Sequence, residues 1–266
     1  MSDKVISFIQ PSRNNLKYLE WSYNSIRKNL GYRHEIMFGD DFSDDGTWEW
    51  LKEIEKKDPN VKIFRNDGPD RKGIVYWYDF LCEKASNEIV MFVHADMYAC
   101  PNMDVEVLKH LEKGKVVTAT RIEPSLHPDG PEKILKDFGI EPEEFDELGL
   151  LEFVESCEDK TTEGIFAPWA IYKEDYWKTG GHDKLFAPQS KEDSDIFNRF
   201  HLLGLQFIQT WKGLVYHMTS RGSRFNPSSG GAPGKDSPEW IHTTTKNMRN
   251  FIRKWGTPVQ HDQHMK

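Results

Sequence analysis

A run of apolar residues near the middle of the chain is the feature that most constrains its fold. Residues 89–93 are all hydrophobic, and Asp96 follows them closely. An unbroken apolar run of this length is typical of a strand buried on both faces of a parallel sheet. An acid just beyond such a strand lies at the carboxyl edge of the sheet, where open α/β folds place their ligands.

An earlier segment repeats this arrangement. Residues 36–38 are apolar, and they are followed by Asp40 and Asp41. Parallel strands bring their carboxyl ends to the same edge of a sheet. Two strands that each deliver acids to that edge therefore indicate a site for a metal-bound ligand that carries a polyphosphate.

Strand and helix signals alternate along the first 120 residues. Strands are expected at residues 5–9, 34–38, 61–64 and 88–93, and helices at residues 16–30, 48–54 and 74–85. This alternation predicts an α/β fold with a mostly parallel central sheet flanked by helices. Apolar periodicity further predicts helices at residues 104–112, 190–203 and 240–255, and strands at residues 116–120 and within residues 205–218.

The length of 266 residues fits a single large domain of two abutting halves. We assign residues 1–121 to the first half and residues 122–218 to the second. Residues 219–266 then form a flexible loop and a C-terminal helix. The loop, residues 220–238, is dominated by Gly, Ser and Pro and is too long for a mere connector.

The net charge of −8 is unevenly distributed. Residues 122–163 hold fourteen acids against three lysines, and the chain after His217 holds eight Lys or Arg against three acids. We interpret residues 122–163 as a solvated acidic insertion, with a wall that steers a polar or cationic acceptor as the alternative. The overall sign of the charge argues against a nucleic acid as partner.

Cysteine content and hydropathy indicate the cellular compartment in which the protein is expected. The three cysteines, Cys82, Cys100 and Cys157, lack metal-binding spacing, and we expect reduced thiols in the cytoplasm. The sequence contains neither an apolar stretch of the roughly 20 residues that span a membrane nor an opening that resembles a signal peptide. No integral membrane segment is therefore expected, and the oligomeric state stays open.

Five segments together resemble a known enzyme family. They are residues 9–13 (IQPSR), 40–47 (DDFSDDGT), 71–73 (RKG), 94–96 (HAD), and 180–186 (GGHDKLF) leading to residues 191–193 (KED). In this order the chain resembles a family 2 glycosyltransferase with the GT-A fold over most of residues 4–218. The resemblance implies a nucleotide-sugar donor, a divalent cation, and an inverting transfer to an acceptor hydroxyl. It makes residues 1–121 the donor-binding half and residues 122–218 the acceptor-binding half.

The resemblance implies a donor site at the ends of the first two strands. Pro11, Ser12 and Arg13 would lie against the base and ribose of the nucleotide. Asp40, with Asp41 beside it, would accept a hydrogen bond from the base, because a carboxylate can read an imide N–H. The alternative for both acids is a loop that caps the following helix.

A basic turn would hold the diphosphate of the donor. Arg71 or Lys72 would lie near it, and Gly73 suits close approach of the backbone to an anion. An exposed basic turn without a ligand is the alternative.

The cation would be held at the segment His94, Ala95, Asp96. Family members usually have two acids separated by one residue, and the first of these is a histidine here. Asp96 matches the acid that contacts the cation, and His217 falls where many GT-A enzymes supply a histidine ligand. His94 and Ala95 would contact the donor, although His94 could also bind metal or simply pack. Mn²⁺ tolerates imidazole better than Mg²⁺ does, so the substitution favours Mn²⁺ while leaving Mg²⁺ open.

The catalytic base is expected at the start of the helix at residues 190–203. Asp193 matches the base of the family, and Glu192 is the second candidate. Capping of the helix is the alternative role for the acids here. Pro168 and Trp169 would form a platform for the acceptor, because aromatic faces stack on sugar rings; interior packing is the alternative for Trp169.

These patterns predict a metal-dependent inverting glycosyltransferase that uses a nucleotide-diphosphate sugar, most simply a UDP-sugar, and a glycan or other hydroxyl-bearing acceptor. Two other classes stay open. A nucleotidyltransferase that acts on sugar phosphates would open with a glycine-rich phosphate loop, which residues 10–14 do not provide. A non-catalytic nucleotide- or sugar-binding module would not need the acids at residues 192–193.

Overall fold

The computed structural model describes residues 5–222 and 224–259. Its first part alternates strands and helices as the sequence predicts. The elements are β1 (Ile6–Ser12), α1 (Leu16–Asn29), β2 (Glu35–Asp40), α2 (Thr47–Lys57), β3 (Val61–Arg65), α3 (Gly73–Lys84) and β4 (Ile89–Phe92). Strands β3, β2, β1 and β4 are neighbours in this order and run parallel.

The second part adds strands of both directions and further helices. Its strands are β5 (Met97–Ala99), β6 (Lys115–Glu123), β7 (Lys133–Leu135), β8 (Thr161–Thr162), β9 (Trp169–Tyr172) and β10 (Gln206–His217). Its helices are α4 (Met103–His110), α5 (Glu147–Ser156), α6 (Lys173–Lys178), α7 (Glu192–Leu202) and α8 (Pro238–Trp255). Short 3₁₀ turns lie at Pro142–Glu144, Lys184–Phe186 and Pro227–Ser229.

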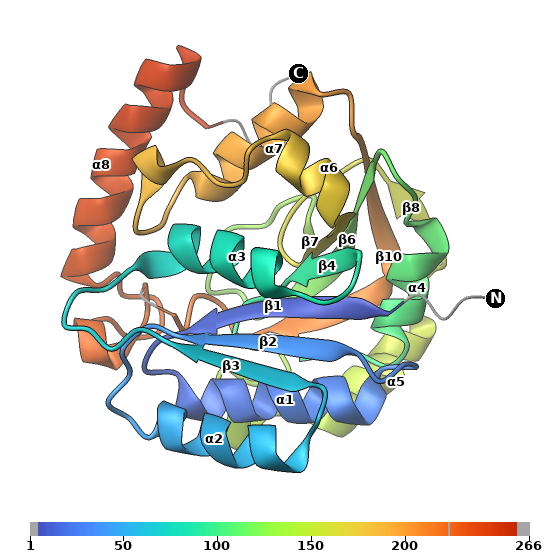
Figure 1. The fold of residues 1–266 in the computed structure, drawn as a ribbon. Coiled ribbons are helices and arrows are strands. Elements are labelled where there is room, and N and C mark those ends of the chain that lie inside the picture. The colour runs from blue at the N-terminus through green and yellow to red at the C-terminus, as the bar shows by residue number, and fades with distance from the viewer. Residues whose placement is uncertain (1–4, 223, 260–266) are drawn as a thin grey trace.

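One sheet runs through the described part of the chain. Its order is β3-β2-β1-β4-β9-β6-β10-β5, with β7 beside β6 and β8 beside β10. Strand β9 is antiparallel to both β4 and β6 and thereby joins the two halves. Helices α1 and α2 lie on one side of strands β1–β3, and α3, α6 and α7 lie on the other (Figure 1). The prediction of a mostly parallel sheet flanked by helices is confirmed.

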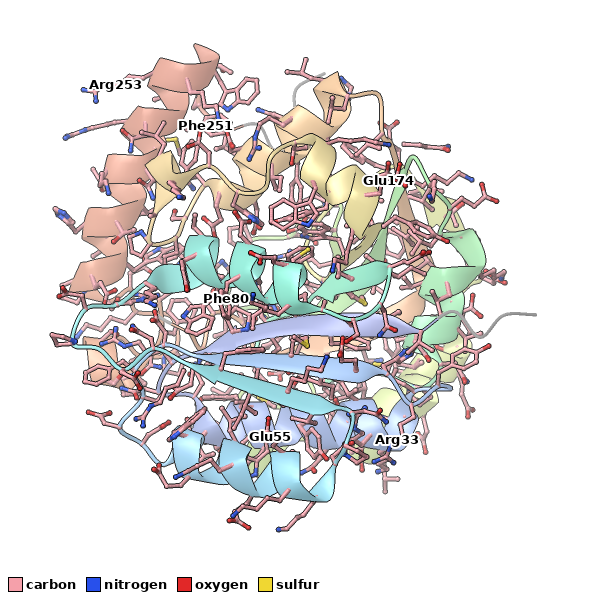
Figure 2. The ribbon with its side chains drawn as sticks, in the orientation of Figure 1. Arg33, Glu55, Phe80, Glu174, Phe251 and Arg253 are labelled. Atoms are coloured by element: carbon pink, nitrogen blue, oxygen red, sulfur yellow. The ribbon has the colours of Figure 1, made fainter. Side chains whose placement is uncertain are left out.

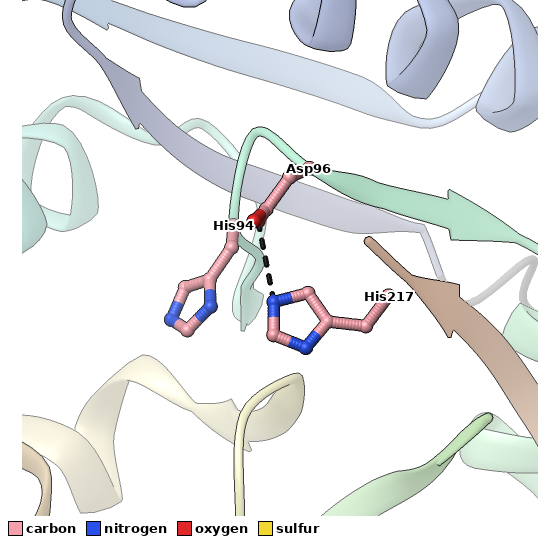
Figure 3. Close-up of side chains that lie close together, drawn as sticks. All are labelled: His94, Asp96 and His217. Atoms are coloured by element: carbon pink, nitrogen blue, oxygen red, sulfur yellow. Dashed lines mark ion pairs between the residues drawn. The ribbon is translucent and has the colours of Figure 1, made fainter. Parts of the chain in front are cut away.

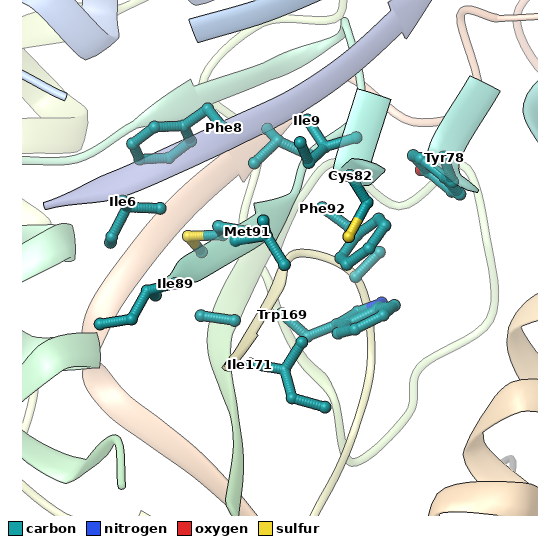
Figure 4. Packing of buried hydrophobic residues seen from close by; sticks show 14 of the residues in the cluster. Ile6, Phe8, Ile9, Tyr78, Cys82, Ile89, Met91, Phe92, Trp169 and Ile171 are labelled. Atoms are coloured by element: carbon teal, nitrogen blue, oxygen red, sulfur yellow. The ribbon is translucent and has the colours of Figure 1, made fainter. Parts of the chain in front are cut away.

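The main core fills the space between the sheet and its helices. Phe8 and Ile9 of β1 and Met91 of β4 are fully buried, and they pack with side chains of α3 and β9 (Figure 4). The continuous apolar run at residues 89–93 is buried throughout, as expected for a central strand. Charged side chains such as Arg33, Glu55, Glu174 and Arg253 lie at the periphery (Figure 2).

A second, smaller core corrects the prediction for residues 122–163. Leu150 and Val154 of α5 and Phe138 are buried together with Ile122 and Tyr216 of the sheet. Strand β7 pairs in parallel with β6. The expectation of a merely solvated insertion is therefore wrong, because this segment contributes a strand, a helix and buried apolar surface.

Helix α8 ends where the sequence predicts and begins two residues earlier, at Pro238 rather than Trp240. The Ser237 side chain accepts a hydrogen bond from the backbone N–H of Trp240, and Pro238 occupies the first turn. Gly256 follows the last turn with φ of 75°, the left-handed conformation that ends many helices. Phe251 packs against Phe186 and Val75, so α8 is attached to the rest of the fold.

Two further expectations concern the chain as a whole. Cys82, Cys100 and Cys157 are unpaired, as predicted. Among the described residues, no helix combines the length and the apolar character needed to cross a bilayer. Cytoplasmic location stays a prediction.

Candidate active site

A cavity of about 370 Å³ lies at the carboxyl edge of the parallel strands. Its walls come from the end of β1, the start of α3, the turn after β4, the start of α7, the end of β10, and the segment that leads to α8. The structure thus brings together segments that lie far apart in the sequence. The prediction that acids following separate strands meet at one edge is confirmed for Asp41 and Asp96, which both line this cavity.

His94, Asp96 and His217 form a cluster within the cavity (Figure 3). One nitrogen or oxygen of each lies within 4.8 Å of those of the other two, and His217 Nε2 is 3.3 Å from Asp96 Oδ1. The cause is local pairing of β5 with β10, in which Met97 lies opposite His217. The backbone N–H of Met218 also donates to the carbonyl of Asp96 at 3.0 Å.

Glu123 orients the imidazole of His217. Its Oε1 lies 2.6 Å from His217 Nδ1, while Lys133 and Arg121 hold the same carboxylate at 2.7 Å and 3.2 Å. With Nδ1 engaged by an acceptor, the other ring nitrogen, Nε2, faces Asp96. Sequence analysis missed Glu123. Its only signal was a position just after a predicted strand, and that position was assigned to the acidic insertion.

Burial and charge set the protonation of this cluster. Burial alone would lower the pKa of His217, but the charges of Asp96 and Glu123 outweigh it and raise the pKa to about 9. Burial alone would raise the pKa of Asp96, but the charges of His217 and His94 and a backbone hydrogen bond lower it. Burial lowers the pKa of His94, which leaves its ring neutral.

The same atoms fit a divalent cation. His217 Nε2 is buried and has no hydrogen-bond partner among the described residues, although Asp96 Oδ1 is 3.3 Å away. Two lone pairs at this separation repel each other unless a proton or a cation lies between them. One carboxylate and one or two imidazoles form a ligand set that suits Mn²⁺ better than Mg²⁺.

Two carboxyl groups at the start of α7 face the cavity. Glu192 and Asp193 both line it, and Glu192 Oε2 and Asp193 Oδ1 are buried without hydrogen-bond partners in the described chain. Burial and the charge of Asp193 raise the pKa of Glu192 to about 8. Asp195 does not line the cavity. It accepts a hydrogen bond from Trp255 Nε1 at 2.9 Å and forms an ion pair with Lys254 at 2.6 Å. The elevated pKa places proton exchange by Glu192 near neutral pH.

Only some of the residues predicted to hold the donor line the cavity. Pro11, Ser12 and Arg13 line it, as do Arg71 and Ala95. Asp41 Oδ2 accepts the N–H of Gly73 at 2.8 Å, and Oδ1 accepts that of Lys72 at 3.0 Å, so Asp41 fixes the start of α3.

Asp40 and Lys72 lie outside this lining. Asp40 is fully buried, accepts the N–H of Ser43 at 3.1 Å and lies 3.4 Å from Arg65. Its role in reading the base stays a prediction. Lys72 is exposed, with Nζ 4.6 Å from the centre of the Tyr76 ring, which matches the alternative of an exposed basic turn.

The predicted acceptor platform is wrong. Trp169 is fully buried in the core, with its ring stacked on Phe92 at a centroid distance of 4.1 Å (Figure 4). Pro168 is buried, and its carbonyl accepts the N–H of Ala119 at 3.1 Å. Neither residue lines the cavity, because β9 lies in the middle of the sheet. The aromatic residues that do line it are Trp77 and Tyr78 of α3 and Trp240 of α8.

The segment at residues 220–238 is attached to the cavity rather than free. The backbone N–H of Arg221 donates to Asp96 Oδ2 at 2.7 Å, and the Arg221 side chain is 1% exposed. The Asn226 amide donates to the carbonyl of Asn14 at 3.0 Å. Described residues of this segment therefore wall the cavity beside the cluster of His94, Asp96 and His217.

Comparison with known proteins identifies the family. Residues 7–174 match the model of Glycosyl transferase family 2. The chain belongs to this family. No curated protein matches it in sequence.

Solved structures share its fold at low identity. GalNAc-T7 with UDP, GalNAc and Mn²⁺ superposes with a TM-score of 0.60 at 16% identity, covering 80% of this chain and 43% of that chain. S. aureus TarS 1–349 in complex with UDP gives 0.54 at 14% identity, covering 80% of this chain and 60% of that chain. This family 2 chain thus spans less than two thirds of either neighbour.

Proposed function

We propose that this chain is a metal-dependent, inverting glycosyltransferase that transfers a sugar from a UDP-sugar to an acceptor hydroxyl. One observation carries the proposal. The metal-type cluster of His94, Asp96 and His217 and the unpartnered carboxyl groups of Glu192 and Asp193 all face a single cavity. Family membership supplies the reaction class.

The choice of donor rests on the shape and polarity of the site. Pro11, Ser12 and Arg13 at the end of β1 offer a backbone edge for the base, and Arg71 lines the same cavity. GalNAc-T7 and TarS, which share the fold, were crystallised with UDP, and the former also with Mn²⁺. These observations support UDP and a divalent cation here.

In the proposed reaction, Asp193 accepts the proton of the acceptor hydroxyl as its oxygen attacks the anomeric carbon. The bond between that carbon and the diphosphate breaks, and the nucleoside diphosphate leaves. Asp96 and His217, together with His94, would hold the cation, which would neutralise charge on the departing diphosphate. Glu192, protonated near neutral pH, limits the negative charge beside Asp193.

Asp193→Asn tests this assignment. The amide cannot take up the proton, so we expect transfer to fall by about 10²–10⁴-fold, while Mn²⁺-dependent UDP binding measured by calorimetry stays within twofold. Asp67→Asn is the matched control, because Asp67 is exposed and lies outside the cavity. Retention of turnover in Asp193→Asn would remove this residue from the role of base.

A further inference from the structure

The turn that leads into α7 has a backbone conformation that its own residues do not favour. Ser190 has φ of 77° and Lys191 has φ of 69°, so two consecutive residues with side chains occupy the left-handed region. Lys191 directly precedes α7, and within the described chain its side chain makes no capping hydrogen bond to the helix. Such residues persist where surrounding contacts determine their conformation. The contacts that hold this turn therefore come from another part of the chain.

Asn247 of α8 supplies two of these contacts. Its side chain is fully buried, and its Nδ2 donates to the carbonyls of Phe186 and Gln189, each at 2.7 Å. Its Oδ1 accepts from the amide of Asn250 at 3.3 Å. Because carbonyls only accept hydrogen bonds, the nitrogen of the Asn247 amide must face them. Both hydrogens of this nitrogen are used, so the chain before the turn is fixed to α8 at two points.

Further contacts of α8 lie before and after the two carboxyl groups at the start of α7. The hydroxyl of Ser190 donates to Thr244 Oγ1 at 2.9 Å. Beyond the carboxyl groups, Asp195 is fully buried, accepts from Trp255 Nε1 at 2.9 Å and pairs with Lys254 at 2.6 Å. Both carboxyl groups therefore lie in a segment that α8 holds at its two ends.

Apolar packing attaches α8 to the fold but does not by itself select this backbone conformation. Phe251 packs against Phe186 and Val75 on the same side of the helix. Hydrogen bonds are directional, so the amide of Asn247 fixes where two carbonyls of the segment lie. Asn247 is not among the residues that line the cavity, whereas Gln189 is. Asn247 thus reaches the cavity through the segment that it holds.

We propose that Asn247 is a positioning residue for glycosyl transfer, because it holds the turn at residues 189–191 in the conformation that brings Asp193 into the cavity. This inference rests on the proposed function, in which Asp193 is the base, and adds to it a residue outside the cavity. Proton transfer requires the base to lie within hydrogen-bond reach of the acceptor oxygen, so a small displacement of this turn slows the reaction. Donor binding depends on other segments, the turn after β4 and the end of β10.

Asn247→Leu removes both donated hydrogen bonds and keeps a side chain of similar size. Turnover is measured with Mn²⁺ as release of UDP to water, using whichever of UDP-glucose, UDP-galactose, UDP-GlcNAc and UDP-GalNAc the wild type cleaves fastest. We expect kcat to fall about 10- to 100-fold, while KM for the donor stays within twofold. An unchanged kcat, or a KM that rises by the same factor, would overturn the proposal.

Phe251→Ala is the matched control, because it loosens the packing of α8 and leaves the amide of Asn247 in place. Its kcat should stay within about twofold at a temperature at which both variants are folded. A fall as large as that of Asn247→Leu would assign the effect to the attachment of α8 as a whole and refute the role of this amide. If Asn247→Leu does not fold, Asn247→Ser, which keeps one donor, should lower kcat by a smaller factor with KM unchanged.

Hydrogen exchange followed by mass spectrometry separates failure of this inference from failure of the proposed function. In Asn247→Leu the backbone amides of residues 189–195 should exchange faster, and those of β1–β4 should exchange as in the wild type. Unchanged exchange at residues 189–195 would refute the hold of Asn247 on the turn, even where the wild type binds UDP with Mn²⁺ and releases it from a donor. If the wild type binds no UDP in the presence of Mn²⁺, the proposed function fails, and the role of Asn247 in the reaction fails with it.

Discussion

The orientation of the His217 ring is fixed by Glu123, which does not line the cavity. Glu123 lies 2.6 Å from Nδ1 and is itself fixed by Lys133 and Arg121, so the free ring nitrogen is directed at Asp96. A carboxylate behind a metal-binding imidazole fixes its tautomer and raises its basicity.

Glu123→Gln should therefore weaken Mn²⁺ binding although Glu123 is not a ligand. We expect a loss of about 10–100-fold in affinity, the usual effect of removing such a partner, measured by titration with Mn²⁺ monitored by electron paramagnetic resonance. Glu132→Gln is the matched control, because Glu132 pairs with Arg121 and Lys133 but makes no bond to His217. An unchanged affinity in Glu123→Gln would contradict the proposed orienting role.

The elevated pKa of Glu192 predicts how stability depends on pH. The pKa is about 8 in the folded protein and 4.5 ordinarily, so the folded protein retains a proton that the unfolded chain loses between these values. The free energy of unfolding should therefore decrease as pH rises from about 4.5 to about 8. Urea denaturation at pH 5 and pH 8 measures this, and Glu192→Gln should reduce the decrease. An equally steep decrease in the variant would assign the effect to other groups.

For single residues, the sequence predicted correctly where the neighbouring sequence itself indicates the position of the side chain. Asp96 follows a buried strand and Asp193 begins a helix, and both reach the cavity. Glu123 and Trp240 could not be predicted, since their roles depend on which strands and helices meet in space. Trp169 was misjudged because composition does not distinguish a core tryptophan from one that faces a ligand.

The element of most functional interest is the segment between β10 and α8. Asn226 anchors it, because its amide donates to the carbonyls of Asn14 and Arg221 and lies 3.1 Å from Asn15 Oδ1. Arg221 in turn contacts Asp96 through its backbone. The anchoring of this wall and the position of the Asp96 carboxylate are thus linked.

Asn226→Ala should loosen this wall. Loss of the buried amide should cost about 1–3 kcal/mol of stability. A loosened wall would admit water to the cavity, so hydrolysis of the UDP-sugar should increase relative to transfer. The ratio of free sugar to glycosylated product measures this change. Asn60→Ala is the control, because Asn60 lies between α2 and β3 and does not line the cavity. An unchanged ratio would show that this segment does not exclude water.

Helices and strands of the first half were predicted closely, and those of residues 122–163 were not. The acids there suggested solvation, but several of them pair with α1: Glu141 lies 2.7 Å from Lys17, and Glu147 lies 2.8 Å from Lys28. A count of charges cannot show which acids meet cations from another part of the chain. Helix α5 and strand β7 were missed for this reason.

For the whole molecule, the decisive element is β9. It pairs with β4 on one side and β6 on the other, so both halves share one sheet. Such continuity favours a single cooperative unfolding transition rather than independent unfolding of each half.

Mn²⁺ and UDP together should shift that single transition upward. A ligand at a hundredfold excess over its Kd stabilises by about 2.7 kcal/mol, and each kcal/mol raises the Tm of a protein of this size by about 2–4 °C. Differential scanning calorimetry should show one peak that moves with both ligands present. Asp96→Ala should lose the shift, and two separate peaks would contradict cooperative unfolding of the halves.

Gly73, at the start of α3, has a consequence for the geometry of the reaction. Its φ is 79°, and a β-carbon placed there would lie 2.3 Å from Pro188 Cβ, in the segment that leads to Glu192 and Asp193. The closeness of the start of α3 to the segment that carries Glu192 and Asp193 therefore depends on the absence of one carbon atom. Any larger residue at this position would push the start of α3 away from Pro188 and widen the cavity between α3 and Asp193.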